Sequence, residues 1–277
     1  MRLLITRLQC LVVIGLLLGT ACGDGANAEE VSNSNQKQLT IYAAASLTEA
    51  FQQLGQQFET EQPDVEVVIS FAGSQQIAQQ LSQGAPGDLF ASANEKQMFN
   101  VINSGRVLQG SDQEFVHNKL VLILPADNPG RINGFGDLTR SGLDLILADQ
   151  SVPVGAYAQE MLQRAAQDPR FGTDFKSIVL RNVVSYEENV RAVLTKIILG
   201  EADVGIVYAS DAAGVPGTDL QVIPIPDEIN IIASYFIAPI ADSPNDQLAQ
   251  DFISLVLSPQ GQEILSEYGF AELSQHE

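Results

Sequence analysis

Hydroxyl side chains follow two predicted strands at the points where each strand leads into a helix. Ser46 comes after the apolar segment 39–45, and Ser74 follows the β-branched segment 65–69 through the turn residues 71–73. A helix N-terminus has unpaired backbone N–H groups and the positive end of the helix dipole. Two serines at two such ends could therefore bind one oxyanion between them. Serine is also a preferred N-cap, so both hydroxyls could instead only cap their own helices.

Each serine precedes a segment with helical periodicity. Ser46 stands three residues before Glu49, which is typical of a capping box, and apolar residues recur at helical spacing from 47 to 58. After Ser74, a second apolar stripe covers 77–81. The sequence therefore predicts that Ser46 opens the first helix at the end of the first strand.

Enzyme motifs are mostly absent from the sequence. The two histidines, His117 and His276, are far apart in the sequence, so neither a clustered zinc site nor a histidine-based triad is visible. The segment 134–137 begins like a dinucleotide fingerprint, but Thr139 stands where the third glycine belongs, which favours a turn. We therefore expect a protein that is not an enzyme and that has no cofactor.

The composition limits the class of partner. The 277 residues include 34 acidic and 14 basic ones, a net charge of −20. Nucleic acid would meet a repulsive field and would lack the basic patch that releases counterions. A hydrophobic content of 45% with 17% charged residues indicates a folded globule, and nucleic acid is excluded as an expected partner.

From residue 38 onward, short β-rich segments alternate with helical segments, which predicts an α/β protein with mainly parallel sheets. Strands are predicted at 39–42, 65–69, 88–91, 119–124, 143–148, 177–184 and 204–208. Helices are predicted at 155–167 and 189–200, and an apolar run at 231–240 precedes an amphipathic section, 247–270, that breaks at Pro259. Two sheet systems joined by two long apolar strands indicate two α/β lobes.

The N-terminal segment has the features of an export signal. Two arginines precede the apolar run 10–19, which is too short to span a bilayer. Cys22 follows small residues and resembles the cysteine of a bacterial lipobox, with Gly19 where that pattern usually has Leu. We expect a lipoprotein-type signal peptide at 1–21, a lipid on Cys22 and a flexible tether at 22–37. The protein would then be periplasmic or extracytoplasmic and anchored to the membrane by this lipid.

Five fragments, in order, carry a resemblance to a known family. They are AAASL (43–47), FAGSQ (71–75), GAPGDLFASA (84–93), VPVGAYA (152–158) and GIVYASD (205–211). Together they resemble the periplasmic molybdate-binding proteins of bacterial ABC importers, over nearly all of residues 38–270. The resemblance implies a type II periplasmic-binding-protein fold, with two α/β lobes joined by a two-strand hinge and a tetrahedral oxyanion between them. Lobe I would comprise 38–118 and 233–277, and lobe II 119–232.

The resemblance also implies the residues of the binding site. Ser46, Ser74 and Tyr208 match the family's hydroxyl ligands. The backbone N–H groups of Val154 and Val190 match its remaining donors, with Val154 standing where the family has Ala. Molybdenum would be held as molybdate through these same five residues, without any separate metal site.

The residues around Val190 support two interpretations. The segment 185–188 has the capping-box pattern, which would start a helix at Tyr186 and bond the Val190 N–H within that helix. The resemblance instead implies that Asn189 is the cap and that the Val190 N–H is free. The spacing of eighteen residues from Val190 to Tyr208 matches the family and favours the second interpretation.

The resemblance implies high-affinity binding of molybdate, and of the nearly isosteric tungstate, for delivery to an ABC transporter permease. Both anions are fully deprotonated near neutral pH, so neutral donors satisfy them, whereas phosphate keeps a proton that needs an acceptor. The alternatives are the same fold with sulfate or phosphate, and an extracytoplasmic enzyme or organic-anion receptor. Such a receptor would need an arginine clamp, and Arg191, beside Val190, is the nearest arginine to the fragments. We expect a monomer that contacts the membrane only through its lipid.

Overall fold

The computed structural model describes residues 36–215, 217 and 219–273. The predicted signal peptide, the lipid-attachment residue Cys22, almost all of the tether and His276 lie outside the described residues. Lys37, expected to belong to the tether, is the first residue of β1 (Lys37–Ala44). Within the described part of the chain, no helix combines the length and the apolar character that crossing a bilayer requires.

Strands and helices alternate along the described chain. The first part contains β1, the 3-10 helix η1 (Ala45–Leu47), α1 (Thr48–Glu61), β2 (Val65–Ala72), α2 (Ser74–Ser82), β3 (Leu89–Ser92), α3 (Glu95–Asn103) and β4 (Gln113–Pro125). The middle part contains η2 (Phe135–Thr139), β5 (Leu145–Ala148), α4 (Pro153–Gln167), α5 (Phe175–Leu180), β6 (Val183–Glu187), α6 (Val190–Ile198), β7 (Val204–Tyr208) and α7 (Ala209–Ala213). The last part contains β8 (Leu220–Pro224), β9 (Ile232–Pro239), α8 (Asp246–Leu257) and α9 (Pro259–Glu267).

The strands form two sheets that share β4. In the first sheet, β1 lies parallel to both β2 and β3, and β9 runs antiparallel to β3. In the second sheet, β5 lies parallel to both β6 and β7, while β8 pairs with β4. The prediction of an α/β architecture with two sheet systems is confirmed.

The two long strands depart from the predicted parallel pattern. β4 pairs antiparallel with β9 over residues 113–119 and with β7 over residues 120–123. The chain leaves the first sheet along β4 and returns to it along β9, so these strands run opposite to their neighbours, and parallel pairing is confined to the βαβ units. The lobe boundaries at 118/119 and 232/233 stay a prediction.

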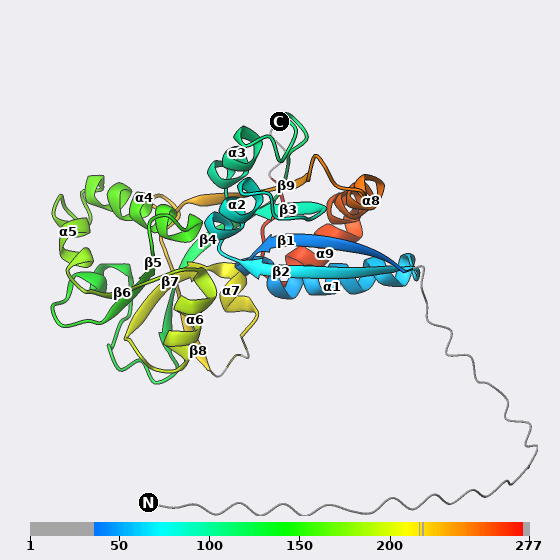
Figure 1. Cartoon of the computed structure of the whole chain (residues 1–277). Helices are drawn as coiled ribbons and strands as arrows, with labels where there is room; N and C mark the ends of the chain where they lie inside the picture. Colours follow the sequence, from blue (N-terminus) through cyan, green and yellow to red (C-terminus); the bar gives the residue numbers. More distant parts are fainter. Residues whose placement is uncertain (1–35, 216, 218, 274–277) are drawn as a thin grey trace, which may run out of the picture. The chain divides into compact units, whose positions relative to one another are not determined.

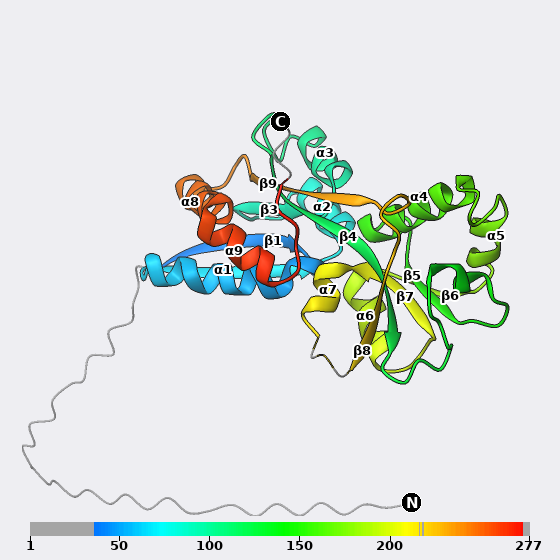
Figure 2. The same cartoon turned by 180° about the vertical axis from the view of Figure 1, so that it is seen from behind.

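Helices cover both faces of the first sheet. Figures 1 and 2 show α2 and α3 on one side of β1 and β3, and α1 and α9 on the other. Leu39 and Ile41 of β1 are buried in one apolar cluster with Phe51 of α1. Phe90 of β3 belongs to a second cluster with Ile77 of α2. Strand alternation therefore directs apolar side chains to both helix layers, which fixes the register of the sheet.

One predicted strand is wrong. The sequence predicts a strand over 177–184, but the structure has α5 followed by β6. Phe175 and Val179, four residues apart, lie on the buried face of α5. Phe175 stacks on Phe135 with ring centroids 5.1 Å apart, and Phe171 packs against both rings. This aromatic cluster favours helical spacing over the local β propensity of the apolar run.

The C-terminal section divides as predicted. α8 ends at Leu257, and Pro259 is the first residue of α9, a position where its missing N–H costs no hydrogen bond. The Ser258 side chain caps α9 by accepting a hydrogen bond from the Gly261 N–H.

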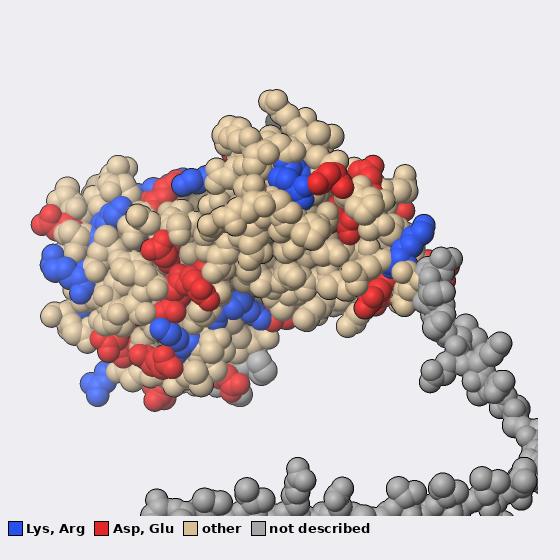
Figure 3. Space-filling view, in the orientation of Figure 1, with Lys and Arg blue, Asp and Glu red and all other residues tan. Residues whose placement is uncertain are grey.

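Charged side chains of both signs are interspersed on the face drawn in Figure 3, where basic side chains are separated by acidic and uncharged ones. Several basic side chains pair with carboxylates, including Arg106 with Asp242 and Lys119 with Asp227. The surface shown therefore presents no continuous basic patch.

Candidate functional site

The carboxyl ends of several strands meet around one pocket. Its lining consists of Ala44, Ala45, Ser46, Gly73, Ser74, Ala93, Val152, Pro153, Val154, Asn189, Val190 and Tyr208. These residues stand at the ends of β1, β2, β3, β5, β6 and β7, where ligands bind in open α/β sheets. All five residues predicted as ligands belong to this lining.

No side chain of the lining carries a formal charge. The lining is made of small or apolar side chains, the serine and tyrosine hydroxyls, and one asparagine. The described ranges also contain no cluster of three or more His, Cys, Asp or Glu side chains that could hold a metal ion. A ligand in this pocket would therefore meet neutral hydrogen-bond donors and helix ends.

Ser46 lies in η1 and does not cap α1. The predicted capping box is wrong, because the N-cap of α1 is Leu47 and the Glu49 side chain pairs with Arg191. The 3-10 turn between β1 and α1 moves the N-cap from Ser46 to Leu47, one residue later, which removes Ser46 from the cap position. The Ser46 Oγ instead lies 2.8 Å from the Oη of Tyr235.

Ser74 is the first residue of α2, whose N-cap is Gly73. Its Oγ accepts a hydrogen bond of 3.0 Å from the Ala93 N–H, at the end of β3. The capping alternative therefore fails for this serine as well. Because Ala93 occupies the oxygen as an acceptor, the hydroxyl proton of Ser74 remains for a partner in the pocket.

Two further donors are backbone N–H groups at helix starts. Val154 is the second residue of α4, after Pro153, and Val190 is the first residue of α6. N–H groups at these positions have no acceptor within their own helix. The N-termini of α2, α4 and α6 thus all open onto the pocket, and their dipoles favour an anion there.

The competing interpretations of Val190 are resolved in favour of the later helix start. Asn189 is the N-cap of α6, and its Oδ1 accepts a hydrogen bond of 2.9 Å from the Ala192 N–H. Ser185, which suggested an earlier capping box with Glu188, lies in β6, where its hydroxyl donates to the Glu187 carboxylate.

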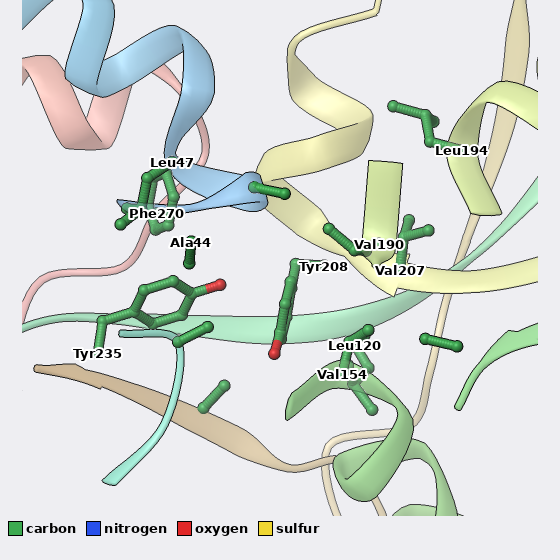
Figure 4. Close-up of a cluster of buried hydrophobic side chains, with 14 of the residues drawn as sticks. Ala44, Leu47, Leu120, Val154, Val190, Leu194, Val207, Tyr208, Tyr235 and Phe270 are labelled. Atoms are coloured by element: carbon green, nitrogen blue, oxygen red, sulfur yellow. The ribbon is translucent and has the colours of Figure 1, made fainter. Parts of the chain in front are cut away.

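Tyr208 contributes a buried hydroxyl to the pocket. The residue is 1% exposed, and its Oη makes no hydrogen bond with the described part of the chain. Burial raises the pKa of Tyr208 well above its ordinary value, so the phenol keeps its proton. Figure 4 shows Tyr208 between Tyr235 on one side and Val154 and Val190 on the other. An unsatisfied buried hydroxyl costs free energy that a ligand oxygen would recover.

A partly buried charge cluster lies behind the lining. The Arg191 guanidinium pairs with Glu49 of α1, and its Nη1 lies 3.6 Å from the Oδ1 of Asp211, which is fully buried. Burial raises the pKa of Asp211 to about 7, although Arg191 opposes this effect. Arg191 is thus engaged with carboxylates of this chain and is not part of the pocket lining, which contains no arginine among the described residues.

Hydrogen bonds also join the two sides next to the pocket, through neighbours of its lining residues. Gln75 Nε2 donates to the Glu188 carbonyl at 2.8 Å, and Gln76 Nε2 donates to the Glu188 Oε2 at 3.1 Å. A β-carbon at Gly73 would lie 2.8 Å from the same carbonyl, so glycine is needed for this approach. The start of α2 is therefore in contact with the segment that precedes α6.

Sequence analysis missed the residues that support the lining. Tyr235 contacts Ser46 across 189 positions, and Glu49 pairs with Arg191 across 142 positions. No local periodicity or spacing indicates pairs so far apart, because they meet only after the two sheets assemble.

Residues 39–271 match the family model of the bacterial extracellular solute-binding proteins. The molybdate-binding protein ModA of Mycobacterium tuberculosis is 37% identical over 266 residues, which cover 95% of both chains. The ModA of Escherichia coli is 32% identical over 244 residues, 86% of this chain and 90% of that one.

A solved structure is also similar to this chain in fold. The structure of the periplasmic molybdate-binding protein of Azotobacter vinelandii superposes with a TM-score of 0.71 at 23% identity, covering 85% of this chain and 100% of that one. The predicted two-lobe type II fold is therefore confirmed. The chain belongs to the bacterial extracellular solute-binding proteins, in the family of the periplasmic molybdate-binding proteins.

Proposed function

We propose that this protein binds molybdate, and also tungstate, outside the cytoplasm and delivers it to the permease of an ABC transporter. One observation carries the proposal: the pocket between the lobes offers hydroxyl and backbone N–H donors, and no side chain of its lining carries a formal charge. A fully deprotonated tetrahedral oxyanion accepts hydrogen bonds at every oxygen, which matches a lining of donors.

The proposed ligands are the hydroxyls of Ser46, Ser74 and Tyr208 and the backbone N–H groups of Val154 and Val190. Hydrogen bonds to a charged acceptor are stronger than those between neutral groups. The N-terminal ends of the helices also stabilise an anion through the helix dipole, so no cationic side chain is needed. The family resemblance and the convergence of all five residues on one pocket support this assignment.

Size selects among the fully deprotonated anions. The S–O bonds of sulfate are shorter than the Mo–O bonds of molybdate, so donors spaced for molybdate would be stretched by sulfate at several contacts at once. Tungstate is nearly isosteric with molybdate and should fit equally well.

Titration calorimetry of the purified protein with molybdate, tungstate and sulfate tests the proposal. We expect molybdate and tungstate to bind with similar affinity and sulfate to bind at least about tenfold more weakly, a difference of about 1.4 kcal/mol. Sulfate binding as tight as molybdate binding would assign the pocket to sulfate instead.

The remaining features of the proposal concern the cellular context. The protein would act as a monomeric, non-catalytic carrier, with Cys22 bearing the lipid that holds it at the membrane. A Cys22→Ala variant should move from the membrane fraction to the soluble fraction after cell lysis. If the variant stayed with the membrane to the same extent as wild type, the lipid on Cys22 would not be the anchor.

A further inference from the structure

Two buried polar side chains stand behind Ser46 on the strands that cross between the lobes. Tyr235 lies on β9 and Asn118 on β4, and they are 0% and 1% exposed. Tyr235 Oη lies 2.8 Å from the Ser46 Oγ, and Asn118 Nδ2 lies 3.4 Å from the same Tyr235 Oη. These contacts form a short chain of hydrogen bonds that ends at the pocket.

The direction of this chain follows from its first member. The Lys119 backbone N–H, which can only donate, donates to the Asn118 Oδ1 at 2.9 Å. The amide of Asn118 is thereby oriented, and its Nδ2 donates to the Tyr235 Oη and, at 2.8 Å, to the Ser210 Oγ. An amide nitrogen does not accept hydrogen bonds, so Tyr235 is the acceptor in its contact with Asn118.

Because Tyr235 accepts from Asn118, we assign its own proton to the contact with Ser46. Burial raises the pKa of Tyr235 well above its ordinary value, so the phenol stays protonated. The Ser46 Oγ is hydrogen-bonded to this phenol, and a buried O–H without an acceptor would be destabilising. With Tyr235 as the donor, the Ser46 proton cannot point back at Tyr235 and is left to point into the pocket.

The Ser74 Oγ also accepts a hydrogen bond from within the protein, in this case from the Ala93 backbone N–H. Both serine oxygens thus receive a hydrogen bond from the protein interior. We propose that Asn118 and Tyr235 are positioning residues that orient the Ser46 hydroxyl so that its proton faces the pocket, and so favour fully deprotonated oxyanions there. This inference rests on the proposed function, because it assumes that Ser46 contacts the bound anion.

A Tyr235→Phe variant removes the donor to Ser46 while keeping the ring. Without this donor, the Ser46 hydroxyl can rotate and turn a lone pair toward the pocket, where it could accept the proton of an anion such as hydrogen phosphate. We expect the Kd for molybdate to rise about tenfold and the ratio of phosphate to molybdate Kd to fall by about tenfold. Asn118→Ala, which removes the previous donor in the chain, should change both values in the same direction by a smaller factor.

The matched control is Tyr268→Phe, since the Tyr268 hydroxyl also makes one side-chain hydrogen bond, to Gln53 at 2.8 Å, away from the pocket. This variant should leave the affinities and their ratio unchanged. A double-mutant cycle supplies a readout that a purely structural role would not change. If Tyr235 acts through Ser46, adding Tyr235→Phe to Ser46→Ala should weaken molybdate binding by less than about twofold further.

Calorimetry on all variants, with thermal melting to confirm that each is folded, separates the outcomes. A wild-type protein that fails to prefer molybdate over phosphate would overturn the proposed function. If the wild-type protein prefers molybdate and the Tyr235→Phe variant keeps the same affinity and selectivity, the proposed role of Tyr235 would be overturned. Additive losses in the cycle would likewise show that Tyr235 does not act through Ser46.

Discussion

The two sides of the pocket supply donors of different kinds. The first-sheet side contributes the side-chain hydroxyls of Ser46 and Ser74, whereas the second-sheet side contributes the backbone N–H groups of Val154 and Val190 together with Tyr208. A side-chain donor depends on residue type and on whatever orients its hydroxyl. A backbone donor depends only on where a helix begins, so it tolerates almost any residue except proline. The valines at 154 and 190 are thus compatible with a polar site although their side chains are apolar.

Removal of a backbone donor should have the largest effect. Val190→Pro deletes the N–H at the first position of α6, where proline is tolerated, and Asn189 already has the extended backbone that a residue before proline prefers. We expect the melting temperature without ligand to stay near wild type and molybdate affinity to fall about 10–100-fold, as calorimetry would measure. Val190→Ala keeps the N–H and should still bind. A large drop in melting temperature for the proline variant alone would show that this N–H is bonded within the helix.

Removal of a side-chain donor should have the next largest effect. Ser46→Ala and Ser74→Ala should each weaken molybdate binding by at least about 1.5 kcal/mol, because a charged acceptor loses its partner. Each should also lower the free energy of unfolding by about 1–3 kcal/mol, since the buried Tyr235 hydroxyl or the Ala93 N–H then lacks its partner. Calorimetry and denaturant unfolding measure the two effects separately. Unchanged molybdate affinity in both variants would remove the serines from the site.

Much of this site was predictable because its residues stand at strand ends, where local patterns are informative. The segments around Ser46, Ser74 and Tyr208 have both a strand or helix pattern and the family resemblance. For the start of α6, the sequence offered two candidate caps, Ser185 and Asn189. The partners of these residues were not predictable, because Tyr235 and Glu49 act across long sequence separations. The same limit explains the wrong strand over 177–184, where Phe135 of η2, distant in the sequence, stacks on Phe175 and stabilises α5.

The two sides should approach each other when the ligand binds. Contacts such as Gln75 with Glu188 join them in this structure, and an anion contacted from both sides would favour that arrangement. Small-angle scattering should therefore give a smaller radius of gyration with saturating molybdate than without it. An equal radius in both conditions would contradict closure of the lobes on the ligand.

The smallest effect concerns pH and the charge cluster behind the lining. The pKa of Asp211 is raised from 3.8 to about 7 in the folded protein, where Arg191, Glu49, Tyr208 and Tyr235 surround its carboxyl group. Its contribution to stability is therefore fully present below about pH 4 and is lost as the pH rises through about 7. Asp211→Asn should flatten this part of the pH profile of unfolding free energy, measured with denaturant. A variant profile that is parallel to the wild-type profile would show that Asp211 does not titrate in this range.

The central claim is that the pocket selects anions by offering donors alone. The most direct measurement is calorimetric titration of the wild-type protein with molybdate and with phosphate near neutral pH. Hydrogen phosphate carries a proton that would find no acceptor, at a cost of about 1–3 kcal/mol. The account predicts tight molybdate binding and phosphate binding that is weaker by at least about tenfold. Phosphate binding as tight as molybdate binding would contradict it.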